Sequence, residues 1–325
     1  MKLLKHLCVF PLVALCLCYG TTTAEEKDLT IGELPSAFEE AGVDSGSLEA
    51  IGQEMMALFD PASKRPGSGT VEPARMVRAK GWQWDHEVRV YLPPSYHHTE
   101  RNYPTLWVTD NSLELIQGAL TGDGLGLAPE LIVVAVGAPA DTNPAEFQRR
   151  RSYDFIPDKS LMGSLFEPMP AEMVGGAPGF LDFLVNQLRP MLAKEYRLDL
   201  DDQGYAGHSG GGQFGLYVLL TKPESFHKYI ISSPAAYQTW LDMEARWYEQ
   251  NKDLDARVFL SAGEGEAAHP IWSASQIVST VATMAERLTV RNYPSLQLTV
   301  KIFADEDHLT VMPIAYTRGI RALWP

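Results

Sequence analysis

Near the middle of the chain the sequence reads Gln203-Gly204-Tyr205-Ala206-Gly207-His208-Ser209-Gly210-Gly211-Gly212-Gln213. Residues 207–211 match the pattern Gly-x-Ser-x-Gly, with a strand-like segment before them at 203–206 and a helix-like segment after them at 213–220. A serine on so tight a turn needs strained backbone angles, and its neighbours must be small because larger side chains would collide with the adjoining strand and helix. The pattern predicts that Ser209 is a nucleophile, although a glycine-rich turn with an idle serine would give the same five letters.

The same turn predicts part of an oxyanion-binding site. It would place Ser209 at the positive end of a helix and direct the Gly210 N–H toward the point where a tetrahedral oxyanion forms. A second donor is expected from the loop that follows a predicted strand at 105–109, and we assign it to Asn111.

A serine hydroxyl is a weak nucleophile and needs a base. Of the seven histidines beyond residue 24, His308 directly follows a late predicted strand at 296–303, which makes it the predicted base. His208 is fixed beside the nucleophile and is expected to point away from it. The other histidines are expected at the solvated surface of early loops (His86, His97 and His98) or in structural roles (His227 and His269).

The acid that orients the base is expected after the predicted strand at 257–261, where two carboxylates follow a turn glycine. We favour Glu266, with Glu264 as the alternative, because a side chain three residues past the glycine can reach the histidine loop. The order serine, acid, histidine then matches the order known for this kind of turn. Weaker candidates for the acid are Asp305, Asp307 and Asp242, and a Ser/His dyad without an acid also stays open.

Strand-like and helix-like segments alternate through the rest of the chain. Further strands are predicted at 87–92 and 131–136, and helices at 180–196, 271–288 and 311–323. The βαβα order predicts a doubly wound, mainly parallel sheet with helices on both faces, which together with the serine turn is an α/β-hydrolase fold. The catalytic domain is expected to span 70–325, after a polar extension at 25–69 with one short helix at 47–59.

Residues 1–24 have the features of an export signal: Lys2 and Lys5 precede an apolar run at 7–19, and the small residues Thr22 and Ala24 follow it. We therefore expect an exported protein, periplasmic or secreted. No later run approaches the roughly 20 apolar residues of a membrane-spanning helix, so no stable membrane insertion is expected.

Composition excludes several classes of function. All three cysteines lie within residues 1–24, so the mature chain offers no thiolate for catalysis or metal binding. Removing these residues takes away two lysines and no acid, which moves the formal charge from −14 to −16 and makes nucleic acid an improbable partner. Neither a metalloprotease motif nor a dinucleotide-binding glycine loop is present, and no cofactor is expected.

Three features around the predicted site have two interpretations each. Arg149 and Arg150 would either recruit an anionic substrate or lie on the surface, whereas Arg151 is expected to pair with Asp154. An apolar stretch would line the substrate pocket or belong to the core (Met162, Leu165, Phe166, Met169 and Met173). The segment 240–251 would cap the site or pack on the sheet through Trp240 and Trp247.

Taken together, these residues resemble the putative esterase family, which includes esterase D, feruloyl esterases, mycolyltransferase antigens and enterobactin-type siderophore esterases. The resemblance covers most of 84–325 and looks closest to the siderophore esterases. Besides Ser209, it rests on Val88-Arg89-Val90-Tyr91-Leu92-Pro93-Pro94, Arg151-Ser152-Tyr153-Asp154-Phe155-Ile156-Pro157, Gly175-Gly176-Ala177, Leu188-Arg189-Pro190, Ser233-Pro234, and His308 with Met312-Pro313. The chain departs from the family in carrying Asp110-Asn111 where relatives often have Asp-Gly.

The sequence therefore predicts a serine carboxylic-ester hydrolase that acts on a small-molecule ester through a covalent acyl-enzyme. An acyltransferase would use the same residues, and a noncatalytic binding domain could keep the same fold. Nothing in the sequence indicates the oligomeric state or the ester that is cleaved.

Overall fold

A computed structural model describes residues 69–110, 112–121, 129–157, 173–235 and 237–325. The predicted signal at 1–24 and the extension up to residue 68, with its predicted helix, lie outside the described residues. So do Asn111 and all of the predicted apolar stretch except Met173. None of the helices in the described ranges is long and apolar enough to cross a bilayer.

Nine strands within these ranges form one sheet, in the order β1-β3-β5-β4-β6-β7-β8-β9, with β2 beside β3. From β5 to β9 every neighbouring pair is parallel, and only the pairs of β3 with β1, β2 and β5 are antiparallel. The predicted mainly parallel sheet is thus confirmed. The strands are β1 (Thr70–Val71), β2 (Arg75–Val77), β3 (His86–Leu92), β4 (Tyr103–Thr109), β5 (Ile132–Gly137), β6 (Leu198–His208), β7 (Lys228–Ser232), β8 (Arg257–Gly263) and β9 (Gln297–Phe303).

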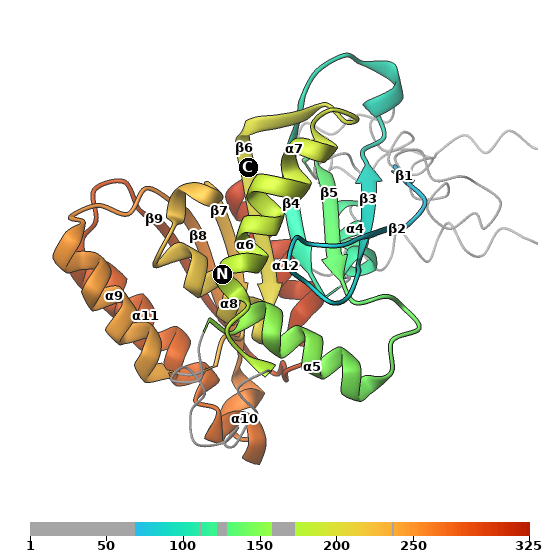
Figure 1. Cartoon of the computed structure of the whole chain (residues 1–325). Helices are drawn as coiled ribbons and strands as arrows, with labels where there is room; N and C mark the ends of the chain where they lie inside the picture. Colours follow the sequence, from blue (N-terminus) through green and yellow to red (C-terminus); the bar gives the residue numbers. More distant parts are fainter. Residues whose placement is uncertain (1–68, 111, 122–128, 158–172, 236) are drawn as a thin grey trace, which may run out of the picture. The chain divides into compact units, whose positions relative to one another are not determined.

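Helices cover both faces of this sheet, as the alternation of strands and helices predicts (Figure 1). Helices α4 and α12 pack on one face, and α8, α9 and α11 pack on the other. The helices are α4 (Leu113–Thr121), α5 (Pro144–Phe155), α6 (Ala177–Asp182), α7 (Arg189–Leu192), α8 (Gly210–Leu219), α9 (Tyr237–Gln250), α10 (Pro270–Ala274), α11 (Ile277–Arg291) and α12 (Val311–Leu323), with single turns η2 (Tyr96–His98), η7 (Pro223–Ser225) and η8 (Glu264–Ala267).

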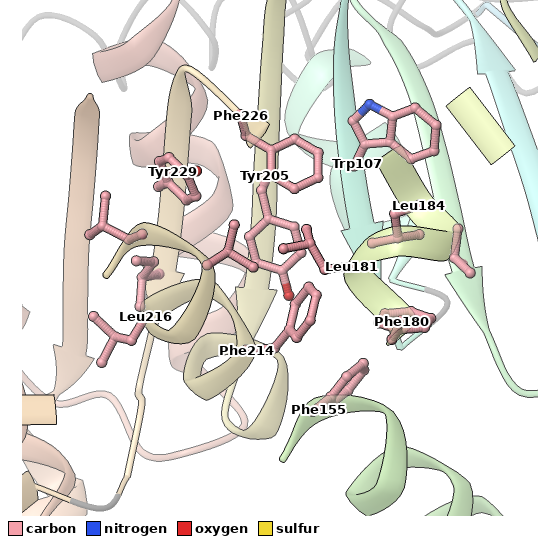
Figure 2. Packing of buried hydrophobic residues seen from close by; sticks show 14 of the residues in the cluster. Trp107, Phe155, Phe180, Leu181, Leu184, Tyr205, Phe214, Leu216, Phe226 and Tyr229 are labelled. Carbon is pink, nitrogen blue, oxygen red and sulfur yellow. The ribbon is translucent and has the colours of Figure 1, made fainter. Parts of the chain in front are cut away.

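The central strands are buried on both sides, so their residues alternate between two hydrophobic clusters. In β7, Tyr229 and Ile231 belong to the larger cluster, whereas Ile230 between them belongs to the smaller one. Figure 2 shows the larger cluster, in which Tyr205 of β6 and Phe214 of α8 meet edge to face with ring centroids 5.6 Å apart. This packing anchors the strand and the helix on either side of Ser209.

Two predicted helices differ from the observed ones. The segment predicted at 180–196 contains a wide π-helical section, η6 (Phe183–Leu188), between α6 and α7. Pro190 explains it, because proline has no N–H and crowds the preceding turn, and the Arg189 N–H bonds the more distant Leu184 carbonyl. The segment predicted at 271–288 is divided into α10 and α11 at Gln276, which has the left-handed angle φ 57°.

The topology brings three loops to one edge of the sheet. Strands β6, β8 and β9 run parallel with β7 between β6 and β8, so their carboxyl ends lie at the same edge. Ser209 follows β6, Glu266 follows β8, and His308 follows β9. Ligand sites of open parallel sheets lie at this edge.

Candidate active site

Ser209 occupies a strained turn between β6 and α8. Its backbone angles are φ 57° and ψ −117°, a region that residues other than glycine rarely adopt. The Ser209 N–H donates to the Ser232 carbonyl at 2.9 Å, which fastens the turn to β7. A Cβ on Gly207 would lie 2.4 Å from the Gly211 carbonyl oxygen, and one on Gly212 would lie 2.5 Å from that of Ser232. The glycines are therefore needed for backbone approach.

His308 lies within hydrogen-bonding distance of Ser209, although 99 residues separate them in the chain. The Ser209 Oγ and the His308 Nε2 are 3.0 Å apart, and the His308 side chain is buried. This geometry allows the hydroxyl to donate its proton to the imidazole.

Glu266 completes a continuous chain of contacts. Its Oε1 accepts from the His308 Nδ1 at 2.5 Å, which leaves Nε2 free to accept from Ser209. Its side chain is fully buried, so the carboxylate depends on protein donors. Oε2 accepts from the Gly263 N–H at 2.9 Å and from the Ser233 hydroxyl at 3.1 Å. Glu264, the alternative acid, is exposed.

The loops that carry the acid and the histidine are joined through their backbones. The Gly265 N–H donates to the Glu306 carbonyl at 2.9 Å, and a Cβ on Gly263 would lie only 2.4 Å from the same oxygen. The two loops thus approach as closely as glycine permits. Ser233, a supporting donor that sequence reasoning missed, sits at φ 49° directly after β7.

The weaker acid candidates make other contacts. Asp307 accepts from the N–H groups of Leu309 and Thr310 at 2.8 and 2.9 Å, and these backbone bonds lower the pKa of Asp307. Asp242 bonds Gln238 within α9, and Asp305 is exposed. Within the described residues, none of these three carboxylates hydrogen-bonds the His308 ring.

Arg151 bonds the turn that carries Ser209 and pairs with Asp110. The predicted pairing of Arg151 with Asp154 is wrong. The Arg151 Nε donates to both carboxylate oxygens of Asp110 at 2.9 and 3.0 Å, and Nη2 donates to the His208 carbonyl at 3.3 Å. A Cβ on Gly210 would lie 2.8 Å from Nη1. Burial opposes the charge of Arg151, but the Asp110 carboxylate outweighs it and raises the pKa of the guanidinium. Asp110 follows β4 with φ 59° and immediately precedes Asn111, the predicted second donor, which lies outside the described residues.

The predicted substrate-binding arginines are engaged within their own helix. Arg149 and Arg150 both donate from Nε to Glu146 at 2.7 Å, and their guanidinium groups lie over the Trp84 ring. The bonds from the two arginines lower the pKa of Glu146 to about 2. A role for either arginine in binding substrate stays a prediction.

His86 is not at the surface, so that prediction is wrong. It begins β3, its side chain is 2% exposed, and its Nε2 lies 2.9 Å from Asp154 Oδ2. Asp154 also accepts from the Trp82 indole at 2.7 Å. No local pattern predicts this pairing, because His86 and Asp154 are 68 residues apart in the sequence.

Of the two interpretations of 240–251, a cap over the site or packing on the sheet, the two tryptophans of α9 fit packing. Trp240 is 1% exposed and donates to the Ala235 carbonyl, and Trp247 donates to the Asp253 carbonyl. Both rings pack with the larger hydrophobic cluster. A cap over the predicted site formed by these two rings is therefore not observed.

Comparison with known proteins identifies the family. The putative esterase family model matches residues 79–294. Ferri-bacillibactin esterase BesA of Bacillus subtilis is 33% identical over 159 residues, which are 46% of this chain and 53% of BesA. A siderophore triacetylfusarinine C esterase of Aspergillus fumigatus is 28% identical over 218 residues, 60% of this chain and 72% of the relative. The chain thus spans about half the length of BesA and a larger share of the fungal esterase.

Solved structures agree on the fold. Siderophore hydrolase EstA of Aspergillus nidulans superposes with a TM-score of 0.67 at 22% identity, covering 81% of this chain and 95% of EstA. At that identity the likeness establishes the architecture, and the predicted α/β-hydrolase fold is confirmed. Because the family model matches about two thirds of the sequence, this chain belongs to the putative esterase family.

Proposed function

We propose that this protein is a serine carboxylic-ester hydrolase in which Ser209 is the nucleophile, His308 the base and Glu266 the orienting acid. The observation that carries the proposal is the unbroken series of contacts Ser209 Oγ, His308 Nε2, His308 Nδ1 and Glu266 Oε1, with distances of 3.0 and 2.5 Å. Membership in the putative esterase family supports the choice of a carboxylic ester as substrate.

In the proposed reaction the Ser209 oxygen attacks the acyl carbon while its proton moves to the His308 Nε2. Glu266 accepts from the opposite side of the ring, so it stabilises the imidazolium and fixes the tautomer. The oxyanion is expected to bind the Gly210 N–H at the start of α8, where the helix dipole also favours negative charge. A second donor is proposed at Asn111.

The tetrahedral intermediate then collapses. The bond from the acyl carbon to the alcohol oxygen breaks, and His308 gives its proton to that oxygen. Water next attacks the acyl-enzyme, again losing a proton to His308, and the acid is released as Ser209 recovers its proton. Nothing is consumed except water and ester.

We further propose that the ester belongs to a siderophore. The support is that two curated relatives from distant organisms, BesA and the triacetylfusarinine C esterase, are both named for siderophore esters. Arg149 and Arg150 are the proposed contacts for an anionic substrate, although each would first have to leave Glu146.

The central test uses Ser209→Ala. We expect the parent to hydrolyse p-nitrophenyl acetate and to be labelled by a fluorophosphonate at Ser209, and we expect the variant to do neither. Retained turnover in the variant would remove Ser209 from the mechanism. Comparing short acyl esters, feruloyl esters and a trilactone siderophore by kcat/KM then tests the substrate.

Two further measurements on the same protein test the alternative functions. Transfer of the acyl group to an added alcohol, detected by product analysis, would favour an acyltransferase. Absence of fluorophosphonate labelling in the parent would favour a noncatalytic binding domain.

Export is a separate proposal that rests on residues 1–24 alone. Mass spectrometry of the mature protein should place its N-terminus near Glu25. An intact N-terminus on protein recovered from the cytoplasm would argue against export.

A further inference from the structure

Trp272 covers a face of the His308 imidazole. The two ring centroids are 3.9 Å apart and the ring planes differ by 21°, which is a stacked arrangement. Trp272 belongs to the short helix α10, which follows directly after the loop that carries Glu266. The acid and the indole therefore reach His308 from neighbouring segments of one connection.

The packing of α10 depends on this tryptophan. The helix has no fully buried residue, and its Ile271 is 56% exposed. Trp272 is its residue that packs against the larger hydrophobic cluster. A helix that inserts no other apolar side chain nevertheless holds an indole against the predicted base.

A second ring borders the same imidazole. The His208 ring centroid lies 4.6 Å from that of His308, with the planes at 48°, and the His208 Nδ1 is 3.1 Å from the Ser232 hydroxyl. The hydrogen bonds to Ser209 and Glu266 fix the direction of the His308 ring within its plane. Contact with the two neighbouring rings restricts its tilt out of that plane.

The Trp272 indole also has an electrostatic effect on His308. His308 becomes positive when it takes the serine proton, and a cation within about 6 Å of an indole face is stabilised by the ring quadrupole. Burial lowers the pKa of His208, and positive charge on His308 and on Arg151 lowers it further, so His208 stays neutral and does not compete for the proton.

The other titratable groups near the stack are few within the described residues. Glu266 bonds the ring directly, and the Asp307 carboxylate in the same loop is held by backbone N–H groups. His269, which is exposed, stacks on Trp272 with ring centroids 5.8 Å apart. The indole is thus the uncharged group in closest ring contact with His308.

We propose that Trp272 is a positioning residue that keeps the His308 imidazole aligned between serine and acid and stabilises its protonated form. This inference rests on the proposed function. It adds a residue whose side chain is neither a proton donor nor an acceptor in the reaction.

The test compares Trp272→Leu, which removes the aromatic face, with Trp272→Phe, which keeps a smaller one. The matched control is Ile271→Ala on the same helix, at an exposed position. The readouts are kcat and KM for p-nitrophenyl acetate, the pH profile of kcat/KM, and the pH profile of the fluorophosphonate labelling rate.

Trp272→Leu should lower kcat roughly tenfold, because a small displacement of the base is costly. It should also move the midpoint of the acidic limb to lower pH by about half a unit, since the imidazolium loses the indole contact. Trp272→Phe should recover most of both effects, and Ile271→Ala should match the parent.

A parent-like kcat and midpoint in Trp272→Leu would overturn the inference. So would a raised KM with an unmoved midpoint, since that result means a contact with substrate alone, and so would a phenylalanine variant as impaired as the leucine variant. A parent that is not labelled at all would instead defeat the proposed function itself.

Discussion

Exchanging Glu266 for glutamine tests the acid with almost no change in shape. The carboxylate is fully buried and uses both oxygens as acceptors, one toward the His308 Nδ1 and one toward Gly263 and Ser233. An amide has one oxygen and one NH2 group, so it cannot accept on both sides. Either orientation of the amide therefore turns an NH2 donor toward a group that donates to Glu266 in the parent.

The two orientations predict the size of the effect. If the amide oxygen faces the Gly263 N–H, its NH2 group faces the His308 Nδ1, which then carries no proton. The proton moves to Nε2, and the ring no longer accepts from Ser209. Loss of the correct tautomer costs about 10³- to 10⁴-fold in kcat, or about 4 to 5 kcal/mol in the barrier. In the other orientation the imidazole keeps its tautomer, but the Gly263 N–H is left buried without an acceptor, which costs about 1 to 3 kcal/mol of stability.

The assay is kcat/KM for p-nitrophenyl acetate at pH 7.5, with circular dichroism to show that each variant is folded. Glu264→Gln is the matched control, because it makes the same chemical change two residues away at an exposed position, and it should stay within about twofold of the parent. A Glu266→Gln variant that keeps kcat/KM within threefold of the parent and also keeps the parent's midpoint in urea unfolding would refute the reasoning and favour a Ser/His dyad. A large loss in Glu264→Gln alone would move the acid to that residue.

Three further predictions concern the supports of the site. Arg151→Met should lower kcat by about tenfold with less effect on KM, because Asp110 loses both bonds from the Arg151 Nε and the guanidinium no longer packs against Gly210. Steady-state kinetics would measure this change, and an unchanged kcat would contradict the prediction. Gly212→Ala should destabilise the protein by about 1 to 3 kcal/mol in urea unfolding, since the new Cβ would lie 2.5 Å from the Ser232 carbonyl oxygen. A midpoint equal to that of the parent would show that the turn can shift to accommodate the methyl group. Burial lowers the pKa of His208, so below about pH 6.5 the unfolded chain binds a proton at this residue that the folded chain does not bind, and the free energy of unfolding should fall as the pH drops. In His208→Gln the midpoint of urea unfolding should therefore change less between pH 7.5 and 5.5 than it does in the parent. An equal change in both proteins would contradict this assignment.

The sequence predicts most of the structural features that lie within one segment, but few of the contacts between segments that are distant in the sequence. The strand, turn and helix around Ser209 are contiguous, so a local pattern predicts this residue. Parallel strands bring their following loops to one edge, and this rule predicts His308 and Glu266. The bond from Ser233 to Glu266 and the stack of Trp272 on His308 depend on how loops pack together, and no local pattern marks them.

The errors have the same origin. The sequence predicts a pair between Arg151 and Asp154, which are three residues apart. The structure instead directs Arg151 across to Asp110, 41 residues away, while Asp154 takes buried donors from His86 and Trp82. Burial decides between these partners, because a carboxylate enclosed by the core must be satisfied there, and sequence spacing does not contain that information.

The proposed acid and base, Glu266 and His308, lie on loops that are joined by more than the bond between their side chains. The Gly265 N–H bonds the histidine loop, Gly263 lets that loop approach, and the Gly263 N–H also holds the Glu266 carboxylate. Ser209 is positioned independently by its strained turn and by its bond to Ser232 of β7. Alignment of serine and imidazole is therefore set where these two frameworks meet, at the His308 ring, which Trp272 and His208 both border. A displacement of either framework acts first on the 3.0 Å contact between Ser209 and His308, which is the longer and weaker of the two bonds in the series.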